Sequence, residues 1–295
     1  MLAVVGDLVE DVIVWPDGAL RSGTDNAAEI YKTRGGSAAN VAAFAAGRYP
    51  TRFIGCVGED ATGDHLEQLL RAEGVDVRLQ RDGTSGTIVI LIEPDGERTM
   101  LPSRGAATRL AQVPASWLAD VELLHIPAYS FDGSPIRQTV ETMIQTVRTQ
   151  GGQISIDASS TQVLETFGTA TFLDYIETLR PEFLIANDDE ADALGFGRSR
   201  AANAILRRMP QTTFVLKAGS KPTRILRADQ DVLTVPVPRV DGVRDSTGAG
   251  DAFAAGFLTS FLKTRELRVA ATGGHALAAA VLGSPGATAS IPTIT

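Results

Sequence analysis

The chain contains 295 residues, which is enough for one large α/β domain with a sizeable core or for two small ones. Its formal net charge of −8 argues against a nucleic-acid-binding protein, and its single cysteine excludes an intramolecular disulfide. No apolar run approaches the roughly 18 residues of a membrane span, and the first residues lack the basic leader of a signal peptide, so we expect a cytoplasmic protein that binds neither membrane nor nucleic acid.

Apolar runs and helical periodicity alternate along the chain. The first half predicts a buried strand at 2–7, a segment at 11–15 that continues it or forms a second strand, an Ala-rich helix at 37–49, a strand at 51–60, an amphipathic helix at 62–74 and a hairpin at 87–101. The second half predicts strands at 121–129, 153–159 and 212–220, a strand running into a helix at 183–194, helices at 134–152, 169–182, 199–209, 252–264 and 267–283, and a hairpin at 223–238.

This alternation predicts βαβ units and a layered α/β fold with a mainly parallel sheet. Two hairpin-like segments, 9–33 and 84–103, are not apolar enough for the central sheet, so we expect them to form a small accessory sheet. The chain contains no internal repeat, low-complexity tract or long linker. We therefore expect residues 1–295 to form a single domain.

The stretch RDSTGAGD, at 244–251, places a carboxylate where a glycine-rich loop enters an apolar helix. Unpaired N–H groups and a partial positive charge make a helix N-terminus an anion site, and small residues at 248–250 let a phosphate approach the backbone. Because a carboxylate repels phosphate, Asp251 is better explained as a base that takes a proton from an attacking hydroxyl. The alternative is a glycine turn with an acid favourably placed in the first helical turn.

Two further stretches suit the same chemistry. In RGGSAAN, at 34–40, Gly35 and Gly36 could present backbone N–H groups to a polyol and Asn40 could add its amide, although a glycine turn that starts a helix is the alternative. In NDDE, at 187–190, Asn187 and Glu190 could hold a hydrated Mg²⁺ or could simply cap a helix. The chain has neither a P-loop nor a G-x-G-x-x-G motif after its first strand, which argues against a dinucleotide oxidoreductase.

Taken together, in this order and spacing, these stretches resemble the ribokinase-like (PfkB) family of carbohydrate kinases. DSTGAGD resembles its carboxyl-terminal signature, GGSAAN its amino-terminal signature and NDDE its N-x-x-E motif. The similarity runs from VVGDLVED to GATASIP, nearly the whole chain. The resemblance implies a three-layer α/β/α ribokinase-like domain with a small β-sheet lid, ATP as phosphoryl donor, and Mg²⁺.

Carried over by position, the resemblance implies that Asp251 is the catalytic base and that the anion hole is formed by the backbone N–H groups of Gly248, Ala249 and Gly250. It implies an acceptor site made of Asp11, Gly35, Gly36, Asn40, Arg104 and Tyr129. It implies nucleotide contacts from Asn187, Lys217, Gly219, Thr247, Gly248, Gly250 and His275. It also implies a water-mediated Mg²⁺ site at Asn187 and Glu190, and a monovalent cation site, such as one for K⁺, at Asp245, Thr247 and Ser290.

Three positions leave alternatives open. Arg104 would suit an acidic group on the acceptor, and is otherwise a solvated surface arginine. His275 lies near the adenine pocket implied by the resemblance, and could equally be a packed helical histidine. Val9 stands where ribokinases often carry a polar residue, which argues against ribose itself as the acceptor.

We therefore expect an ATP- and Mg²⁺-dependent kinase that phosphorylates a hydroxymethyl or other alcohol group of a sugar, sugar acid or related polyol, with a preference for an acidic or strongly polar acceptor. A nucleoside kinase is the alternative with the same chemistry, and a catalytically silent sugar- or nucleotide-binding protein is the alternative from another class. The lid is expected to close over the acceptor, and two lids are expected to pair in a homodimer.

Overall fold

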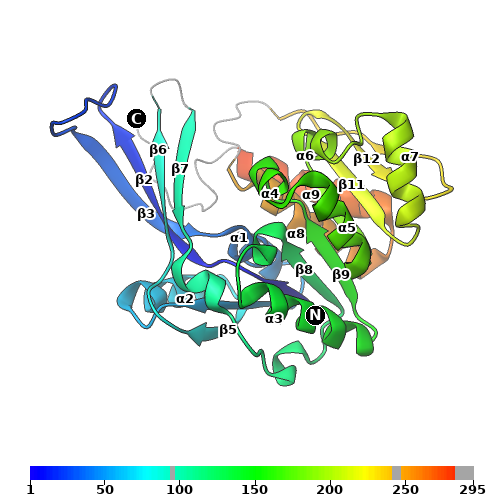
Figure 1. Ribbon diagram of the computed structural model, residues 1–295, viewed down its shortest axis with the longest axis horizontal. Helices are drawn as coiled ribbons and strands as arrows, with labels where there is room; N and C mark the ends of the chain where they lie inside the picture. Colours follow the sequence, from blue (N-terminus) through cyan, green and yellow to red (C-terminus); the bar gives the residue numbers. More distant parts are fainter. Residues whose placement is uncertain (94–96, 241–246, 283–295) are drawn as a thin grey trace.

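The computed structural model describes residues 1–93, 97–240 and 247–282. Two β-sheets organise these residues, and the smaller sheet projects from the side of the α/β body (Figure 1). We call them the central sheet and the small sheet.

The central sheet has nine strands among the described residues. In spatial order they are β13 (Leu233–Val235), β12 (Lys221–Leu226), β11 (Thr213–Ala218), β10 (Phe183–Ala186), β9 (Gln153–Asp157), β8 (Leu123–Pro127), β1 (Leu2–Val5), β4 (Thr51–Val57) and β5 (Asp76–Arg81). In this spatial order, all neighbouring strands between β11 and β5 pair in parallel, and β12 and β13 add an antiparallel edge. Because parallel strands end on one edge, the loops that follow them converge there.

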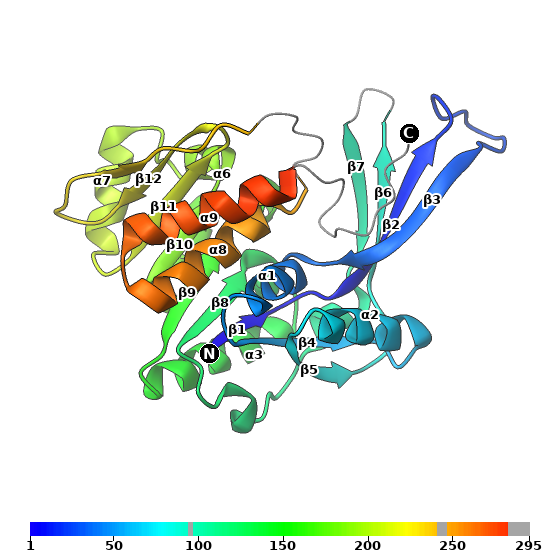
Figure 2. The same cartoon turned by 180° about the vertical axis from the view of Figure 1, so that it is seen from behind.

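Helices cover both faces of the central sheet (Figures 1 and 2). One face packs against α3 (Ile136–Thr149), α4 (Thr161–Phe167), α5 (Thr169–Leu179), α6 (Asp188–Ala193) and α7 (Ser199–Arg208). The other face packs against α1 (Ser37–Ala46), α2 (Ala61–Ala72), α8 (Ala249–Thr264) and α9 (Leu267–Leu282). Short 3₁₀ turns span Gly105–Arg109, Ala115–Leu118 and Ala128–Phe131.

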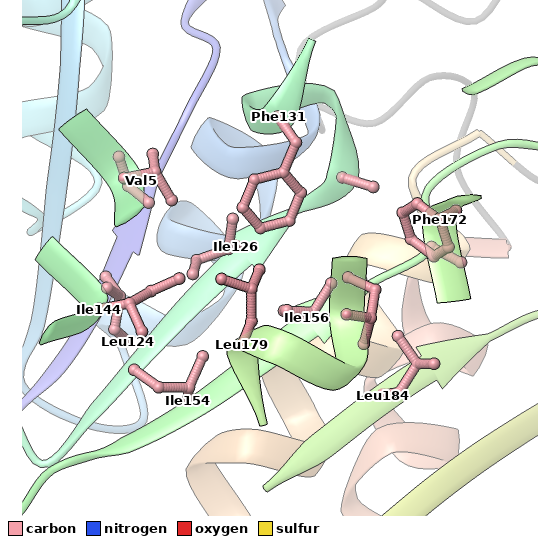
Figure 3. Packing of buried hydrophobic residues seen from close by; sticks show 14 of the residues in the cluster. Val5, Leu124, Ile126, Phe131, Ile144, Ile154, Ile156, Phe172, Leu179 and Leu184 are labelled. Atoms are coloured by element: carbon pink, nitrogen blue, oxygen red, sulfur yellow. The ribbon is translucent and has the colours of Figure 1, made fainter. Parts of the chain in front are cut away.

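The apolar strands bury both of their faces, as a parallel sheet between helices requires. Successive residues of β9 and β10 alternate between the two helical layers: Ile154, Ile156 and Leu184 belong to one core cluster, and Phe183 and Ile185 to the other. Figure 3 shows the first cluster, in which aromatic rings from the helical side pack over the aliphatic side chains of the strands. This close packing holds the carboxyl ends of the strands in fixed relative positions.

The small sheet consists of four strands in the order β3 (Ala28–Gly35), β2 (Val9–Pro16), β6 (Thr87–Ile92) and β7 (Arg98–Ser103). Residues that pair across its strands share a face, so the register separates two sets of side chains. One set contains Asp11, Ile88 and Pro102, followed by Ile13, Ile90 and Met100. The opposite set contains Val12, Val89 and Leu101, followed by Val14, Ile30 and Leu91.

The fold class predicted from the sequence is confirmed, including the mainly parallel sheet and the smaller separate sheet. Residues 11–15 belong to β2 of the small sheet and do not continue β1. The sequence analysis missed β5, a sheet-edge strand with only two apolar residues, and α4, which is too short for helical periodicity to show. No helix within the described residues is long and apolar enough to cross a membrane.

Candidate active site

A cavity of about 510 Å³ lies between the small sheet and the carboxyl edge of the central sheet. Four acidic residues line it: Asp7, Asp11, Asp132 and Asp251. Its apolar lining comes from the small sheet, through Ile88, Ile90, Met100 and Pro102, and from α4, through Val163 and Phe167. The remaining lining residues are Gly36, Ser37, Asn40, Arg104, Tyr129, Ser160, Gln162, Thr166, Thr247 and Gly248. The cavity therefore joins an acidic end to an apolar end.

Asp251 lies in the first turn of α8 and reaches the acidic end of the cavity. Gly248 adopts a left-handed backbone with φ of 75°, and no side chain caps the N-terminus of α8. The Ser37 hydroxyl donates a hydrogen bond of 2.7 Å to Oδ1 of Asp251, and Nδ2 of Asn40 donates one of 3.0 Å to Oδ2. Burial raises the pKa of Asp251 to about 6, although these two hydrogen bonds oppose the shift.

Asp11 extends from β2 into the same end of the cavity. A Cβ atom at Gly35 would lie 2.1 Å from Oδ1 of Asp11, and one at Gly36, where φ is 99°, would lie 2.3 Å from the Asp7 carbonyl oxygen. Only glycine fits at either position. Oδ1 of Asp11 is buried without a hydrogen-bond partner, and burial raises the pKa of Asp11 to about 7.

Arg104 lines the cavity, but all five of its N–H groups have partners. Nε and Nη2 donate to the two carboxylate oxygens of Asp7 at 2.7 and 2.8 Å. Nη2 also donates to the Tyr129 carbonyl, and Nη1 donates to the carbonyl and the carboxylate of Asp132. An acidic acceptor would find no free donor on this guanidinium, so the geometry opposes the expectation that Arg104 binds an acid.

Lys217 lies on β11, beside the first turn of α8. A Cβ atom at Gly250 would lie 3.2 Å from Nζ of Lys217, and the same Nζ donates to Oδ2 of Asp157 at 3.1 Å. Burial works against the charge on Lys217, but the carboxylates of Asp157 and Glu190 raise its pKa overall. A positive charge therefore stands next to the N-terminus that the sequence predicts to bind an anion.

Asn187 and Glu190 form a closed capping box at the start of α6. Oε2 of Glu190 accepts from the Asn187 backbone N–H at 2.8 Å, and Oε1 accepts from Nδ2 of Asn187 at 2.7 Å. Burial, followed by the charge of Asp157, raises the pKa of Glu190 to about 7. Both Glu190 oxygens thus already accept hydrogen bonds, and within the described residues no three acidic, histidine or cysteine side chains cluster as a metal site.

The remaining predicted site residues divide into three groups. Tyr129 and Thr247 line the cavity. Gly219 lies in the turn after β11, and His275 is buried against Phe253 with its Nε2 2.8 Å from the Thr223 hydroxyl, so neither lines the cavity. Asp245 and Ser290, predicted for the monovalent cation, lie outside the described residues.

Several site residues were missed by the sequence analysis. Asp157 ends β9, and an acid at the carboxyl end of a buried strand is the signal that could have identified it. Ser37 stands inside RGGSAAN but was not assigned a role. Arg34 opens the same stretch and was not assigned a role either. No sequence pattern pointed to the Asp7–Arg104 pair or to the α4 residues at the apolar end, because these positions depend on how distant segments pack.

Comparison with known proteins decides the family. The family model for pfkB family carbohydrate kinases matches residues 1–294. The chain belongs to this family. Among curated proteins it is 29% identical over 273 residues to a fructokinase from Salmonella typhimurium, covering 87% of this chain and 83% of that protein. It is 28% identical over 213 residues to aminoimidazole riboside kinase from the same species, covering 70% of this chain and 66% of that protein.

Solved structures show the same fold. The adenosine kinase from Sinorhizobium meliloti superimposes with a TM-score of 0.84 at 21% identity, covering 99% of this chain and 96% of that one. The ribokinase from Thermotoga maritima superimposes with a TM-score of 0.80 at 22% identity, covering 99% and 96%. The prediction of an ATP-dependent carbohydrate kinase is thus confirmed at the level of the family.

The raised pKa values predict an unusual acidic limb in the pH profile of this kinase. A base must be ionised to accept a proton, and Asp251 and Asp11 protonate near pH 6 and 7, well above an ordinary aspartate. We expect kcat/KM for the acceptor to fall as the pH is lowered through 7 and 6. Initial rates of ADP release across the pH range measure this, and a profile that stays flat down to pH 5 would contradict the assignment.

Proposed function

We propose that the protein transfers the terminal phosphoryl group of ATP to a hydroxymethyl group of a neutral sugar or sugar-containing acceptor, with Asp251 as the general base. The observation that carries this proposal is the position of the Asp251 carboxylate. It lies partly buried at the uncapped N-terminus of α8, bound by Ser37 and Asn40, in the same cavity as Asp11. Carboxylates orient hydroxyl groups, and a helix N-terminus attracts phosphate.

In this proposal Asp11 accepts hydrogen bonds from acceptor hydroxyls, and Asp251 accepts the proton of the attacking hydroxyl. With a pKa of about 6, Asp251 is ionised at neutral pH yet more basic than an ordinary aspartate, which suits proton abstraction. The backbone N–H groups of residues 248–250, together with Lys217, stabilise the charge that develops on the transferred phosphoryl group.

We propose Mg²⁺ as the metal that accompanies ATP. When bound, Mg²⁺ would neutralise charge on the phosphates. Asn187 and Glu190 would contact its water shell, because both Glu190 oxygens already accept hydrogen bonds inside the capping box. K⁺ activation through Asp245, Thr247 and Ser290 stays a prediction.

Asp251→Asn tests the base. It should retain ATP binding and lower kcat by roughly 10² to 10⁴, the range for a lost general base. ADP release measures kcat, and calorimetry measures ATP binding. Asp64→Asn is the matched control, since Asp64 is also an acid in the first turn of a helix but lies outside the cavity. Near-normal turnover in Asp251→Asn would refute the role, and a wild type without any phosphoryl transfer would favour the catalytically silent binding protein.

The cavity favours a neutral acceptor over a sugar acid. Four carboxylates line it, and Arg104, the one arginine or lysine that lines it within the described chain, is fully paired. A nucleoside is the second candidate because the apolar side chains of the small sheet and of α4 could hold a heterocyclic base beyond the sugar. The aminoimidazole riboside kinase relative is consistent with such an acceptor.

Met100→Ser separates the two acceptor types. Met100 faces the cavity and is 51% exposed, so serine should cost little stability. For a nucleoside acceptor, we expect kcat/KM relative to free ribose to fall about five- to tenfold, which corresponds to roughly 1 kcal/mol of lost apolar contact.

Leu101→Ser is the control for Met100→Ser. Leu101 is 55% exposed on the same strand but faces away from the cavity, so its replacement should leave that ratio unchanged. Equal ratios in both variants, or turnover of free sugars alone, would exclude the nucleoside.

We further propose that the small sheet closes over the acceptor and that two copies pair through its outer face. Closure would exclude water, which otherwise competes for the phosphoryl group. Two features support pairing: within the described part of the chain β3 and β7 are the edge strands of the small sheet, and the outer face carries the apolar side chains of Val12, Val14, Ile30, Val89, Leu91 and Leu101.

Light scattering tests the pairing. It should give twice the chain mass of 31.1 kDa, and Ile30→Glu on the outer face should give a monomer. Leu20→Glu is the control, because Leu20 is similarly exposed but lies outside the strands. A monomeric wild type would exclude the dimer and leave the closure of the small sheet as a separate proposal.

A further inference from the structure

Arg34 is a buried cation behind the acidic end of the cavity. It lies near the end of β3 with 2% of its surface exposed. Nη1 donates to Oδ1 of Asn40 at 2.9 Å, and Nη2 donates to a carboxylate oxygen of Glu73 at 3.2 Å. Asn40 in turn donates to Asp251, so a continuous hydrogen-bonded chain runs from Glu73, near the surface, to Asp251.

The first consequence concerns the amide of Asn40. Its oxygen accepts from Arg34 while its nitrogen donates to Asp251. If the amide were turned over, its N–H groups would face the N–H groups of the guanidinium and its oxygen would face the carboxylate, so both contacts would become repulsive. Arg34 therefore fixes which end of Asn40 meets the base.

The second consequence concerns charge. Around Asp251, the described charged and titratable groups are Asp11 on β2, Arg34 on β3, Tyr129, Asp157 on β9 and Lys217 on β11. Two of these are acids and two are cations. Lys217 is hydrogen-bonded to Asp157, whereas the acidic partner of Arg34 is Glu73, which is 39% exposed and therefore screened by solvent. The Arg34 charge acts most strongly on Glu73, and after it on Asp11 and Asp251. On Asp251 it adds to the charge of Lys217, which also favours the ionised carboxylate.

We propose that Arg34 is a positioning residue of the phosphoryl-transfer site: it holds the Asn40 amide so that it donates to Asp251, and it adds a second positive charge, beside that of Lys217, behind the Asp251 carboxylate. This inference rests on the proposed role of Asp251 as base. Arg34 itself does not line the cavity, so it acts through Asn40 and through its charge.

Three variants separate the two effects. Arg34→Met removes the charge and the donor, Arg34→Lys keeps the charge but loses the guanidinium fork, and Glu73→Gln leaves Arg34 in place without its counter-charge. Arg52→Met is the matched control, because Arg52 is also a buried arginine that pairs with a carboxylate, Asp76, but lies away from the cavity.

The first measurement is the carboxyl titration of Asp251, by NMR of protein labelled with ¹³C at aspartate Cγ and assigned with Asp251→Asn. In Arg34→Met the Asp251 pKa should rise by about one unit, the effect of removing a nearby opposite charge. In Glu73→Gln it should fall slightly, because Arg34 is then less neutralised. Arg34→Lys should stay near the wild type, and Arg52→Met should lower the melting temperature only.

The second measurement is the pH profile of kcat and kcat/KM with the best acceptor of the wild type. In Arg34→Met the acidic limb should move to higher pH with the titration. Well above both pKa values, where Asp251 is ionised in every variant, kcat should remain roughly tenfold low in Arg34→Met because the Asn40 amide is no longer held. KM for ATP should not change.

An Asp251 titration and an acidic limb that stay at their wild-type positions in Arg34→Met would overturn the proposal and leave Arg34 a structural residue. Should Arg34→Met not fold, an unshifted titration in Glu73→Gln together with wild-type kcat in Arg34→Lys would overturn it equally. If the Asp251 titration shifts in Arg34→Met but the wild type transfers no phosphoryl group to any acceptor, the proposed function is refuted and the charge effect is retained.

Discussion

The arrangement of the site depends on the partly buried Asp251 carboxylate, which extends from α8 and is bound by two residues of α1. Ser37 and Asn40 bind it from positions 214 and 211 residues away in the chain, so the two signature segments meet at a single carboxylate. A buried charge is costly unless it is hydrogen-bonded, and these two donors offset part of that cost. The desolvation cost that remains raises the pKa of Asp251, and the higher pKa makes the carboxylate a better proton acceptor.

Glycines make this burial possible by removing side chains where backbones must approach. Gly35 leaves room for the Asp11 carboxylate, and Gly36 leaves room for the Asp7 carbonyl. At the other signature, Gly248 supplies the left-handed residue that turns the chain into α8. A side chain at any of these positions would separate β2, α1 or α8 from its neighbours, and the two acids would no longer share one cavity.

Charges in and around the cavity are divided between two roles. Asp7 and Arg104 neutralise each other within the protein. Their hydrogen bonds connect the end of β7 to the loop after β1, and Arg104 also binds Asp132. Asp11 and Asp251 keep carboxylate oxygens facing the cavity, with Arg34 and Lys217 behind them. The small sheet, from which Asp11 itself extends, adds apolar side chains on the same face as this acid. A neutral molecule with hydroxyl groups at one end matches this division better than an anion does.

The sequence by itself determined the fold class, the two-sheet organisation and the family, because hydrophobic periodicity and the glycine-rich motifs are local signals. It also pointed to Asp251 and Asn40, which stand in motifs, and to Asp11, which was placed by its position in the family resemblance. Only the tertiary structure decided what surrounds them: that Asp7 and Asp132 occupy the donors of Arg104, that Glu73 pairs with Arg34 behind Asn40, and that α4 and the small sheet form an apolar end. These facts depend on which distant side chains meet when the sheets and helices pack, and no spacing within one segment encodes that.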